Sequence, residues 1–268
     1  MLPSSKIRNK PSDVMLDLLR GVSERGRPAS YLVESGRLFG FTENTVRVTL
    51  SRLVNRGLLA CPERGRYRLA DQTDHLQSFI ERWRLGENRV RQWKPGTWVL
   101  AVLSKRAASS LWALDALGFR EVNPHLFVRP DNLAVTLTEL TQLAIGIGVG
   151  MDVLLLEGQL AGEAAWMSLW NPENLNNGYR DIVKRLDSSS KKLLGLSMGE
   201  AQLESFRLGG EAIKLLAKDP LLPAEVIDVK AREKFCQLLM DYNRAGKDIW
   251  ASAGELHHTM PVRQLVRA

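Results

Sequence analysis

The chain has 268 residues, of which 44% are apolar and 25% charged, and its formal net charge is +7. This composition is ordinary for a folded globular protein, so it argues against a disordered chain, and the length predicts two or three domains. The longest apolar stretches, at 98–103 and 149–156, fall short of the roughly 20 residues of a membrane-spanning helix. Residues 1–10 lack the apolar run of a secretory signal, so we expect a cytoplasmic protein without a membrane partner.

The positive charge is confined to the first quarter of the chain. Residues 1–69 contain 13 Lys and Arg against 6 Asp and Glu, a net charge of +7, and the remainder contains 24 of each, a net charge of zero. A basic module joined to a neutral body is typical of a protein that binds a polyanion, because Lys and Arg release the counterions condensed on nucleic acid. A merely solvated basic surface is the alternative that charge alone leaves open.

The apolar pattern of the basic region predicts three short helices. The first covers 12–22, and the second covers about 30–39 and ends at Gly40. The third begins after Thr42, a residue suited to cap it, and ends before Gly57. Three consecutive helices with a glycine-containing turn before the last one indicate a helix-turn-helix.

The third helix has one apolar face and one polar face. With Val46, Leu50 and Leu53 pointing inward, the step of about 100° per residue places a polar face outward. Asn can pair with adenine, Arg with guanine, and Val can contact the methyl group of thymine. We therefore expect this helix to contact DNA. The outward residues are Asn44, Val48, Ser51, Arg52 and Asn55, and Thr45 and Arg47 lie on the flanks.

Two short strands, at 58–61 and 66–69, are predicted to form a wing around the turn at 62–65. Arg64, Arg66 and Arg68 alternate with other residues here, so at the two-residue period of a strand their guanidinium groups share one face. We expect these arginines to contact DNA phosphates beside the helix. A three-helix scaffold with a solvated charged face is the structural alternative.

The body of the chain begins after a predicted arginine-rich helix at 71–91. Beyond it, strand and helix patterns alternate, which indicates an α+β domain. The strands are expected at 98–103, 121–128 and 149–156, with helices at 106–117 and 133–143 between them. The remainder has mainly helical patterns, at 179–186, 190–195, 200–216 and 231–242, with a turn at 171–174.

Three segments together resemble the PaaX family, the phenylacetic acid catabolon repressors. Residues 39–59, followed by Gly-Arg-Tyr-Arg-Leu at 65–69, look like the DNA-binding segment of that family. The tryptophans and the Pro-Gly turn at 93–98 resemble the start of its middle domain. Residues 216–223, with the run Asp-Pro-Leu-Leu-Pro, are similar to a signature of its C-terminal domain.

The resemblance implies an α+β chain with a winged helix-turn-helix, a ferredoxin-like middle domain similar to the Cas2 nucleases, and a mainly helical C-terminal domain. We place these parts at 1–70, 95–175 and 176–268, with a helical linker at 71–94. Nuclease chemistry is not expected. An acidic metal ligand is lacking at the end of the first strand, where Leu103 is followed by Ser104, Lys105 and Arg106.

We expect no cofactor and no metal. Cys61 and Cys236 are too few for a zinc site, and the four histidines show no metal-ligand spacing. Gly146, Gly148 and Gly150 are not followed by the Gly-Lys-Ser/Thr of a phosphate loop. Four tryptophans, Trp112, Trp166, Trp170 and Trp250, are candidates for an aryl pocket, although a core position is the more ordinary role of tryptophan.

The predicted protein is a homodimeric transcription regulator and not an enzyme. It would bind a two-fold operator of double-stranded DNA and be released by a small-molecule effector. The resemblance implies aryl-CoA effectors and repression of aromatic or acyl-CoA catabolic genes such as those of phenylacetate. Two alternatives remain open: an enzyme that acts on a CoA ester and carries a DNA-binding module, and a non-catalytic module that assembles proteins.

Overall fold

The computed structural model describes residues 10–20, 25–70, 88–161 and 163–255. The chain divides into two compact units, residues 1–78 and residues 79–268, which are taken separately below. Helices and two antiparallel sheets make up the described residues, which confirms the α+β class. Most of the predicted linker helix at 71–91 lies outside the described residues. None of the described helices combines the length and the apolar character needed to cross a bilayer.

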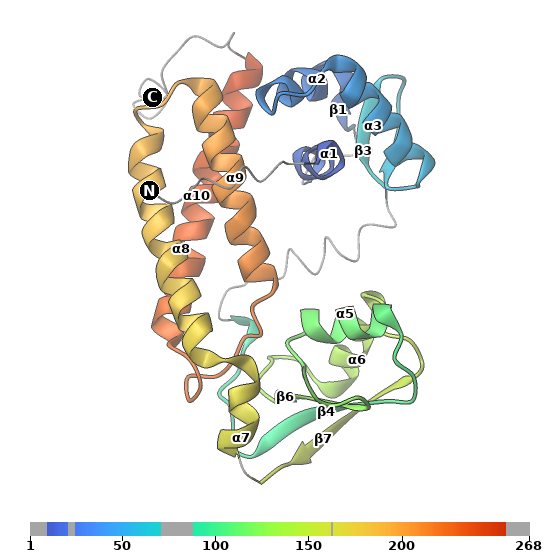
Figure 1. The fold of residues 1–268 in the computed structure, drawn as a ribbon, viewed down its shortest axis with the longest axis vertical. Helices are drawn as coiled ribbons and strands as arrows, with labels where there is room; N and C mark the ends of the chain where they lie inside the picture. Colours follow the sequence, from blue (N-terminus) through green and yellow to red (C-terminus); the bar gives the residue numbers. More distant parts are fainter. Residues whose placement is uncertain (1–9, 21–24, 71–87, 162, 256–268) are drawn as a thin grey trace. The chain divides into compact units, whose positions relative to one another are not determined.

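The first unit contains three helices and a small sheet (Figure 1). The three helices and the two wing strands confirm the predicted order. A further strand precedes the second helix, and all three strands pair antiparallel in the order β1-β3-β2. In chain order the elements are α1 (Pro11–Leu19), β1 (Arg27–Pro28), α2 (Ala29–Leu38), α3 (Glu43–Asn55), β2 (Leu59–Ala60) and β3 (Arg66–Leu69).

The turn between α2 and α3 is built by a glycine. Gly40 has a φ of +79°, in the left-handed region that other residues rarely adopt. Its N–H donates to the carbonyl of Arg37 at 2.9 Å, and the N–H of Phe41 donates to the carbonyl of Gly36 at 3.0 Å. These two bonds form a Schellman motif, which ends α2 and turns the chain directly into α3.

The core of the first unit fixes the angle at which α3 leaves this turn. Val46, Leu50 and Leu53 of α3 are buried against side chains of α1 and α2. At the crossing of α2 and α3, a Cβ on Gly36 would lie 2.6 Å from a methyl carbon of Val46. The two helices approach so closely because residue 36 has no side chain.

The second unit begins with a four-stranded antiparallel sheet in the order β5-β6-β4-β7. The predicted strand at 121–128 is wrong as one element. Two strands occur there and form a hairpin, because the chain turns at residues 124–125, where the Asn123 side chain accepts the N–H of His125. The strands are β4 (Thr97–Leu103), β5 (Arg120–Asn123), β6 (Leu126–Pro130) and β7 (Val153–Gln159).

Two helices, α5 (Ala108–Ala116) and α6 (Leu137–Gly146), cover one face of this sheet (Figure 1). The observed order is therefore β-α-β-β-α-β, with one strand more than the sequence predicted. The core between the helices and the sheet is aliphatic except for two phenylalanines. Its buried residues include Val99, Ala101, Leu103, Ala113, Leu114, Phe119, Phe127, Leu140 and Ala144.

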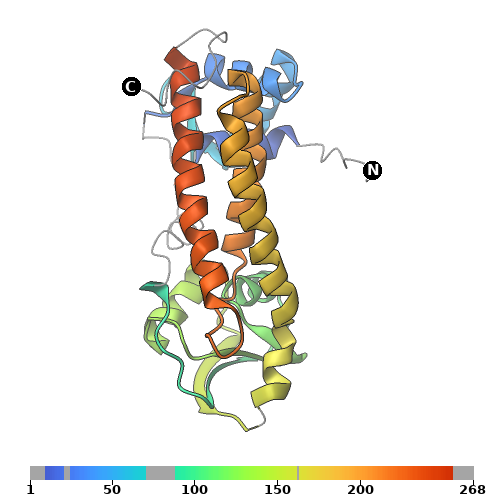
Figure 2. The same cartoon turned by 90° about the vertical axis from the view of Figure 1, so that its left-hand side faces the viewer.

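Three long helices run side by side in the rest of the unit (Figure 2). They are α8 (Pro172–Leu193), α9 (Met198–Ala217) and α10 (Val229–Glu255), preceded by a short α7 (Glu163–Met167) and a 3-10 turn, η3 (Ser168–Trp170). The two helices predicted at 179–186 and 190–195 are one helix, α8. The predicted turn at 171–174 is the start of this helix, because the Asn171 side chain caps it at Asn174.

Tryptophans join the sheet to the helices. Trp98 of β4 lies edge-on to Trp93, with ring centroids 5.8 Å apart, and stacks on Trp170 at 6.2 Å. The indole N–H of Trp170 donates to the carbonyl of Gly118, where α5 ends. All three tryptophans are buried in the same core as the long helices. The predicted boundaries at 94/95 and 175/176 thus fall inside one compact unit, and the second falls within α8.

Candidate nucleic-acid interface

Helix α3 is held with its polar face outward by its cap and its core residues. Thr42 caps the helix through its hydroxyl oxygen, which accepts the N–H of Thr45 at 3.1 Å, as the sequence predicted. Val46 and Leu50 are fully buried, and Leu53 is 2% exposed. Because these three side chains point into the core, the opposite side of the helix is presented to solvent.

The exposed side of α3 carries the residues expected to contact bases. Val48 is 39% exposed, which is unusual for valine and leaves an apolar group among polar ones. The polar members combine amide, hydroxyl and guanidinium groups that can read base edges. The exposed residues of this face are Asn44, Val48, Ser51, Arg52 and Asn55.

The flanking residues Thr45 and Arg47 have partners within the helix. The Thr45 hydroxyl lies 2.8 Å from that of Thr42, and Nε of Arg47 donates to Glu43 at 2.8 Å. Glu43 is also 3.7 Å from a guanidinium nitrogen of Arg37. One carboxylate thus stands between two exposed arginines, so the start of α3 keeps a net positive charge. A phosphate would also meet the positive end of the helix dipole here.

The wing arginines differ in their surroundings. Arg64 is exposed at the turn before β3, next to Gly65, whose φ is +79°. Arg66 is half-buried, and its Nε and one Nη donate to the carbonyls of Arg25 and Gly26, both at 2.8 Å. Arg68 is also half-buried and donates to the carbonyl of Leu69 at 3.0 Å. The two-residue alternation therefore applies only to Arg66 and Arg68, because Arg64 precedes the strand.

Strand β1 adds an arginine that the sequence analysis did not assign to the interface. Arg27 pairs with Tyr67 of the wing, is exposed, and lies with its guanidinium carbon 5.0 Å from the ring centroid of Tyr31. Gly26 before it has a φ of +65°, and a Cβ there would lie 2.5 Å from the carbonyl oxygen of Tyr67. A strand of two residues has no periodicity to detect, so only the Arg-Pro dipeptide before a helix could have indicated it.

The described residues contain no group of three or more His, Cys, Asp or Glu side chains that could hold a metal ion. The ionisable groups of the interface are mainly guanidiniums, and the geometry provides hydrogen-bond donors and positive charge. It offers an elongated anion or a base edge several points of contact on one face of α3 and on the adjoining strands.

Comparison with known proteins agrees with this arrangement. Residues 17–73 match the family model described as PaaX-like protein, a range that includes α2, α3 and the wing. No curated protein matches the chain. Among solved structures, the uncharacterized protein Rv0674 from Mycobacterium tuberculosis is similar, with 22% identity and a TM-score of 0.62 over 91% of this chain and 99% of that one. That likeness concerns the fold alone. The match over residues 17–73 is to the PaaX-like family that the sequence motifs indicated.

Proposed function

We propose that the protein is a transcription regulator that binds double-stranded DNA through α3 and the wing. The observation that carries this proposal is the exposed face of α3, where Asn44, Val48, Ser51 and Arg52 lie side by side at the helical spacing, opposite the buried residues of the helix. This set combines base-reading groups with an apolar contact for thymine. Arg47, Arg64, Arg66 and Arg68, with Thr45, surround the face and supply phosphate contacts.

Two independent observations support DNA as the partner. The chain's whole excess of positive charge lies in residues 1–69, and this region is the one that matches the PaaX-like model. A module that assembled proteins would have no need of this concentration of arginine around a polar helix. A DNA-binding module needs it, because each phosphate contact releases counterions from the duplex.

The second unit is proposed to dimerise and to bind the effector. Its β-α-β-β-α-β order and the strand order β5-β6-β4-β7 support a ferredoxin-like middle domain, joined to a helical C-terminal part. Two copies would place two α3 helices on the half-sites of a two-fold operator. By analogy with the PaaX-like family, we propose repression of aromatic or acyl-CoA catabolic genes, relieved by an aryl-CoA-like effector in the cytoplasm.

Catalysis is not part of the proposal. Strand β4 ends at Leu103, and Ser104 after it bonds the backbone of Asp152 through its N–H at 2.9 Å. The next residues are Lys105 and Arg106, and Arg106 pairs with Glu121 at 3.0 Å. A metal-dependent nuclease of this topology would need a carboxylate ligand at this strand end, where the chain instead places two cations.

The test is to capture genomic DNA fragments on the purified full-length protein and to sequence them. We expect a few fragments that share an inverted repeat and lie upstream of catabolic genes. A variant in which Asn44, Ser51 and Arg52 are all replaced by alanine should lose these fragments, since the three exposed side chains can be removed without touching the core. Retention of DNA without any shared sequence, or equal capture by the variant, would contradict the proposal.

A further inference from the structure

The second unit contains a cavity of about 310 Å³ that no part of the interface uses. It lies between the end of α5, the segment after β6, the helix α6, and the end of α9. Most of its wall is aliphatic, formed by Leu117, Leu133, Val135, Leu143, Leu216 and Leu221. Its volume is at the lower end of the range of small-molecule sites.

A buried cation forms part of this wall. Arg129 is 2% exposed, and within the described residues its guanidinium donates to neutral oxygens: the carbonyls of Leu117, Pro130 and Pro220 and the side chain of Asn132. Burial lowers the pKa of Arg129 to about 9, which leaves it a cation at neutral pH. Such a group is unusual, because buried charges are normally paired.

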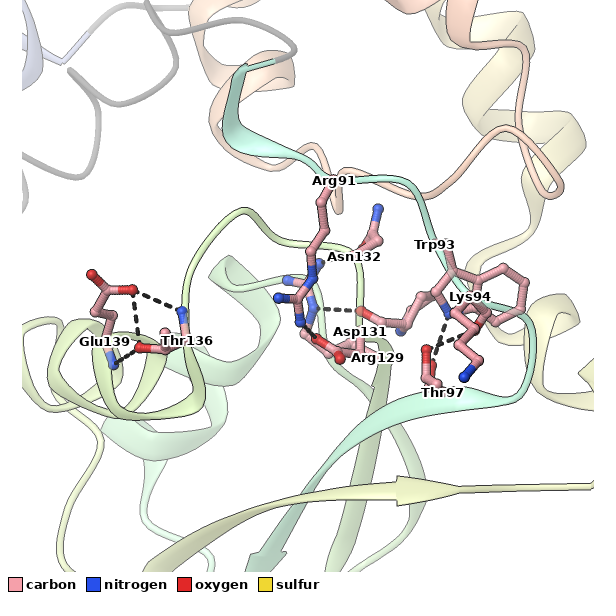
Figure 3. Close-up of polar contacts among 10 residues, drawn as sticks. Arg91, Trp93, Lys94, Thr97, Arg129, Asp131, Asn132, Thr136 and Glu139 are labelled. Atoms are coloured by element: carbon pink, nitrogen blue, oxygen red, sulfur yellow. Dashed lines mark hydrogen bonds and ion pairs between the residues drawn. The ribbon is translucent and has the colours of Figure 1, made fainter.

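The acid two residues after Arg129 in the chain is already engaged by another arginine. Asp131, whose charge favours the charged form of Arg129, pairs with Arg91 at 2.6 Å. Figure 3 shows Arg129 and Asn132 beside this pair, with Thr136 and Glu139 of the α6 cap to one side. Glu139 also lines the cavity, but its carboxylate caps α6 through the N–H and hydroxyl of Thr136. The wall also contains Arg89 and the carboxylates of Glu139 and Asp219, but none of the hydrogen bonds of Arg129 among the described residues goes to a carboxylate. An anion in the cavity would supply that pairing.

A buried acceptor lies in the same wall. Asp219 is 7% exposed, and its Oδ1 accepts the Tyr179 hydroxyl at 3.0 Å and the N–H of Leu221 at 2.8 Å. Its Oδ2 is buried and has no hydrogen-bond partner in the structure. Leaving a buried acceptor unsatisfied is costly, so a ligand that donates a hydrogen bond there would be favoured.

The backbone around this acceptor is constrained. Leu221 has a φ of +54°, which a branched residue adopts only when its surroundings require it, and the Asn132 side chain donates to its carbonyl. Asp219 and Leu221 belong to the Asp-Pro-Leu-Leu-Pro segment, for which a rigid turn is the ordinary explanation. The segment is such a turn, and it also presents Asp219 to the cavity.

We propose that this cavity is a ligand site separate from that of the aryl-CoA-like effector, and that it binds a small carboxylic acid with a compact apolar body and a hydroxyl group. The carboxylate would pair with Arg129, the hydroxyl would donate to Oδ2 of Asp219, and the body would fill the space between the leucines. A whole CoA thioester exceeds a cavity of this size, and its acyl end carries no anion for Arg129. Binding of the acid at this site would not depend on DNA or on the effector.

The test titrates four probes into the full-length protein in a calorimeter. They are 3-phenylpropanoate, 3-phenyllactate with a hydroxyl beside the carboxylate, 3-(4-hydroxyphenyl)propanoate with a hydroxyl at the far end, and 3-phenylpropanoyl-CoA. We expect one of the two hydroxylated acids to bind at least about tenfold more tightly than 3-phenylpropanoate, because it satisfies Asp219. Binding of the thioester alone, or of none of the acids, would overturn the proposal.

Three variants locate the site, and two of them leave its charged groups unchanged. Ala116→Phe, at the end of α5, places a ring in the cavity and should abolish binding, whereas Ala108→Phe, exposed at the start of the same helix, should not. Asp219→Asn keeps an oxygen for Tyr179 and Leu221 and should remove the advantage of the hydroxylated acid. Unchanged affinity in Ala116→Phe would refute the cavity as the site, even if the variant Asp219→Asn failed to fold.

The same samples separate the two proposals. Binding of the acid by a protein that captures no specific DNA would contradict the proposed regulator and support the cavity. Specific DNA binding without acid binding would contradict only the cavity.

Discussion

Arg52 is exposed on the middle of the polar face of α3, where a side chain can reach a base without any change in the core. We predict that Arg52→Ala weakens binding to the captured operator by about 1–3 kcal/mol and relaxes selectivity at one base pair. The measurement is a competition assay between the operator and its single-base variants. The substitution should leave the free energy of unfolding almost unchanged, since an exposed side chain contributes little to it.

Arg20→Ala provides the matched control for this prediction. Arg20 follows α1, is exposed, and pairs with Asp17 at 3.2 Å. It carries the same charge as Arg52, but it lies at the end of α1, which is not expected to enter a groove. Equal losses in the two variants would show that net charge, and not the face of α3, determines affinity.

Arg66 and Arg64 are separated by one residue, yet we predict different main effects of their removal: a loss of stability for Arg66 and a weaker salt dependence for Arg64. Arg66→Ala should lower the stability of the first unit by about 1–3 kcal/mol, because the carbonyls of Arg25 and Gly26 lose their donors. Arg64→Ala should leave stability unchanged and reduce the slope of log affinity against log salt by about one unit. Thermal unfolding and salt titration check the two effects, and an unaltered melting temperature in Arg66→Ala would contradict the first.

Two glycines that end helices have the same φ but different surroundings, and this difference gives a prediction about whole elements. Gly40 and Gly118 both have a φ of +79°, after α2 and α5. A Cβ on Gly40 meets nothing within 4 Å, whereas one on Gly118 would lie 2.8 Å from the carbonyl oxygen of Pro220. Gly40→Ala should cost about 1–2 kcal/mol from backbone strain, and Gly118→Ala about 2–4 kcal/mol because steric overlap is added.

Hydrogen exchange followed by mass spectrometry can test both variants, because it resolves peptides from each unit. Gly118→Ala should speed exchange in α5 and in the 219–223 segment together, since the clash lies between them. Similar losses of stability in the two variants would indicate that the Asp-Pro-Leu-Leu-Pro segment moves away from the added methyl group at little cost in free energy.

Helices α2 and α3 were predictable because each has a local stop. Gly40, Thr42 and Gly57 determine where α2 ends and where α3 begins and ends, and all three act through neighbouring residues. The hairpin β5–β6 was missed although it also has a local signal. Residues 121–128 contain the dipeptide Asn123-Pro124, which is typical of a turn, but the prediction of one strand did not use this signal. The bond between His125 and Asn123 and the pairing of β6 with β4 divide the segment into two strands.

The sequence predicted which side of α3 is exposed, but it did not predict the hydrogen bonds of the wing arginines. Helical spacing alone placed Asn44, Val48, Ser51 and Arg52 outside, and the structure exposes them all. The spacing could not show that Arg66 bonds residues 25 and 26, because those bonds join segments about 40 residues apart. The cavity beside Arg129 and Asp219 also depends on long-range contacts, since the two residues are 90 positions apart in the chain.

The excess positive charge of the protein lies in the first of its two compact units. The unit that carries α3 includes the basic residues 1–69, and the unit with the sheet and long helices is nearly neutral. The neutral unit still contains many arginines, and several of them pair with acids, as in the two hydrogen bonds between Arg185 and Glu211, at 2.5 and 2.6 Å. The positions of the charges, and not the net charge of the chain, should therefore determine how strongly salt weakens DNA binding.

Two triple variants with the same net charge test this conclusion. Replacing the exposed Arg47, Arg52 and Arg64 by glutamine removes three charges from the first unit, and replacing Arg180, Arg207 and Arg244 removes three from the second. Each phosphate contact contributes a slope of about −0.9 to log affinity against log salt. The first variant should therefore lose about 2–3 units of slope on any duplex, and the second should match the unchanged protein. Equal slopes in both variants would mean that DNA binding depends on the net charge of the whole chain. The proposed phosphate contacts of α3 and the wing would then be wrong.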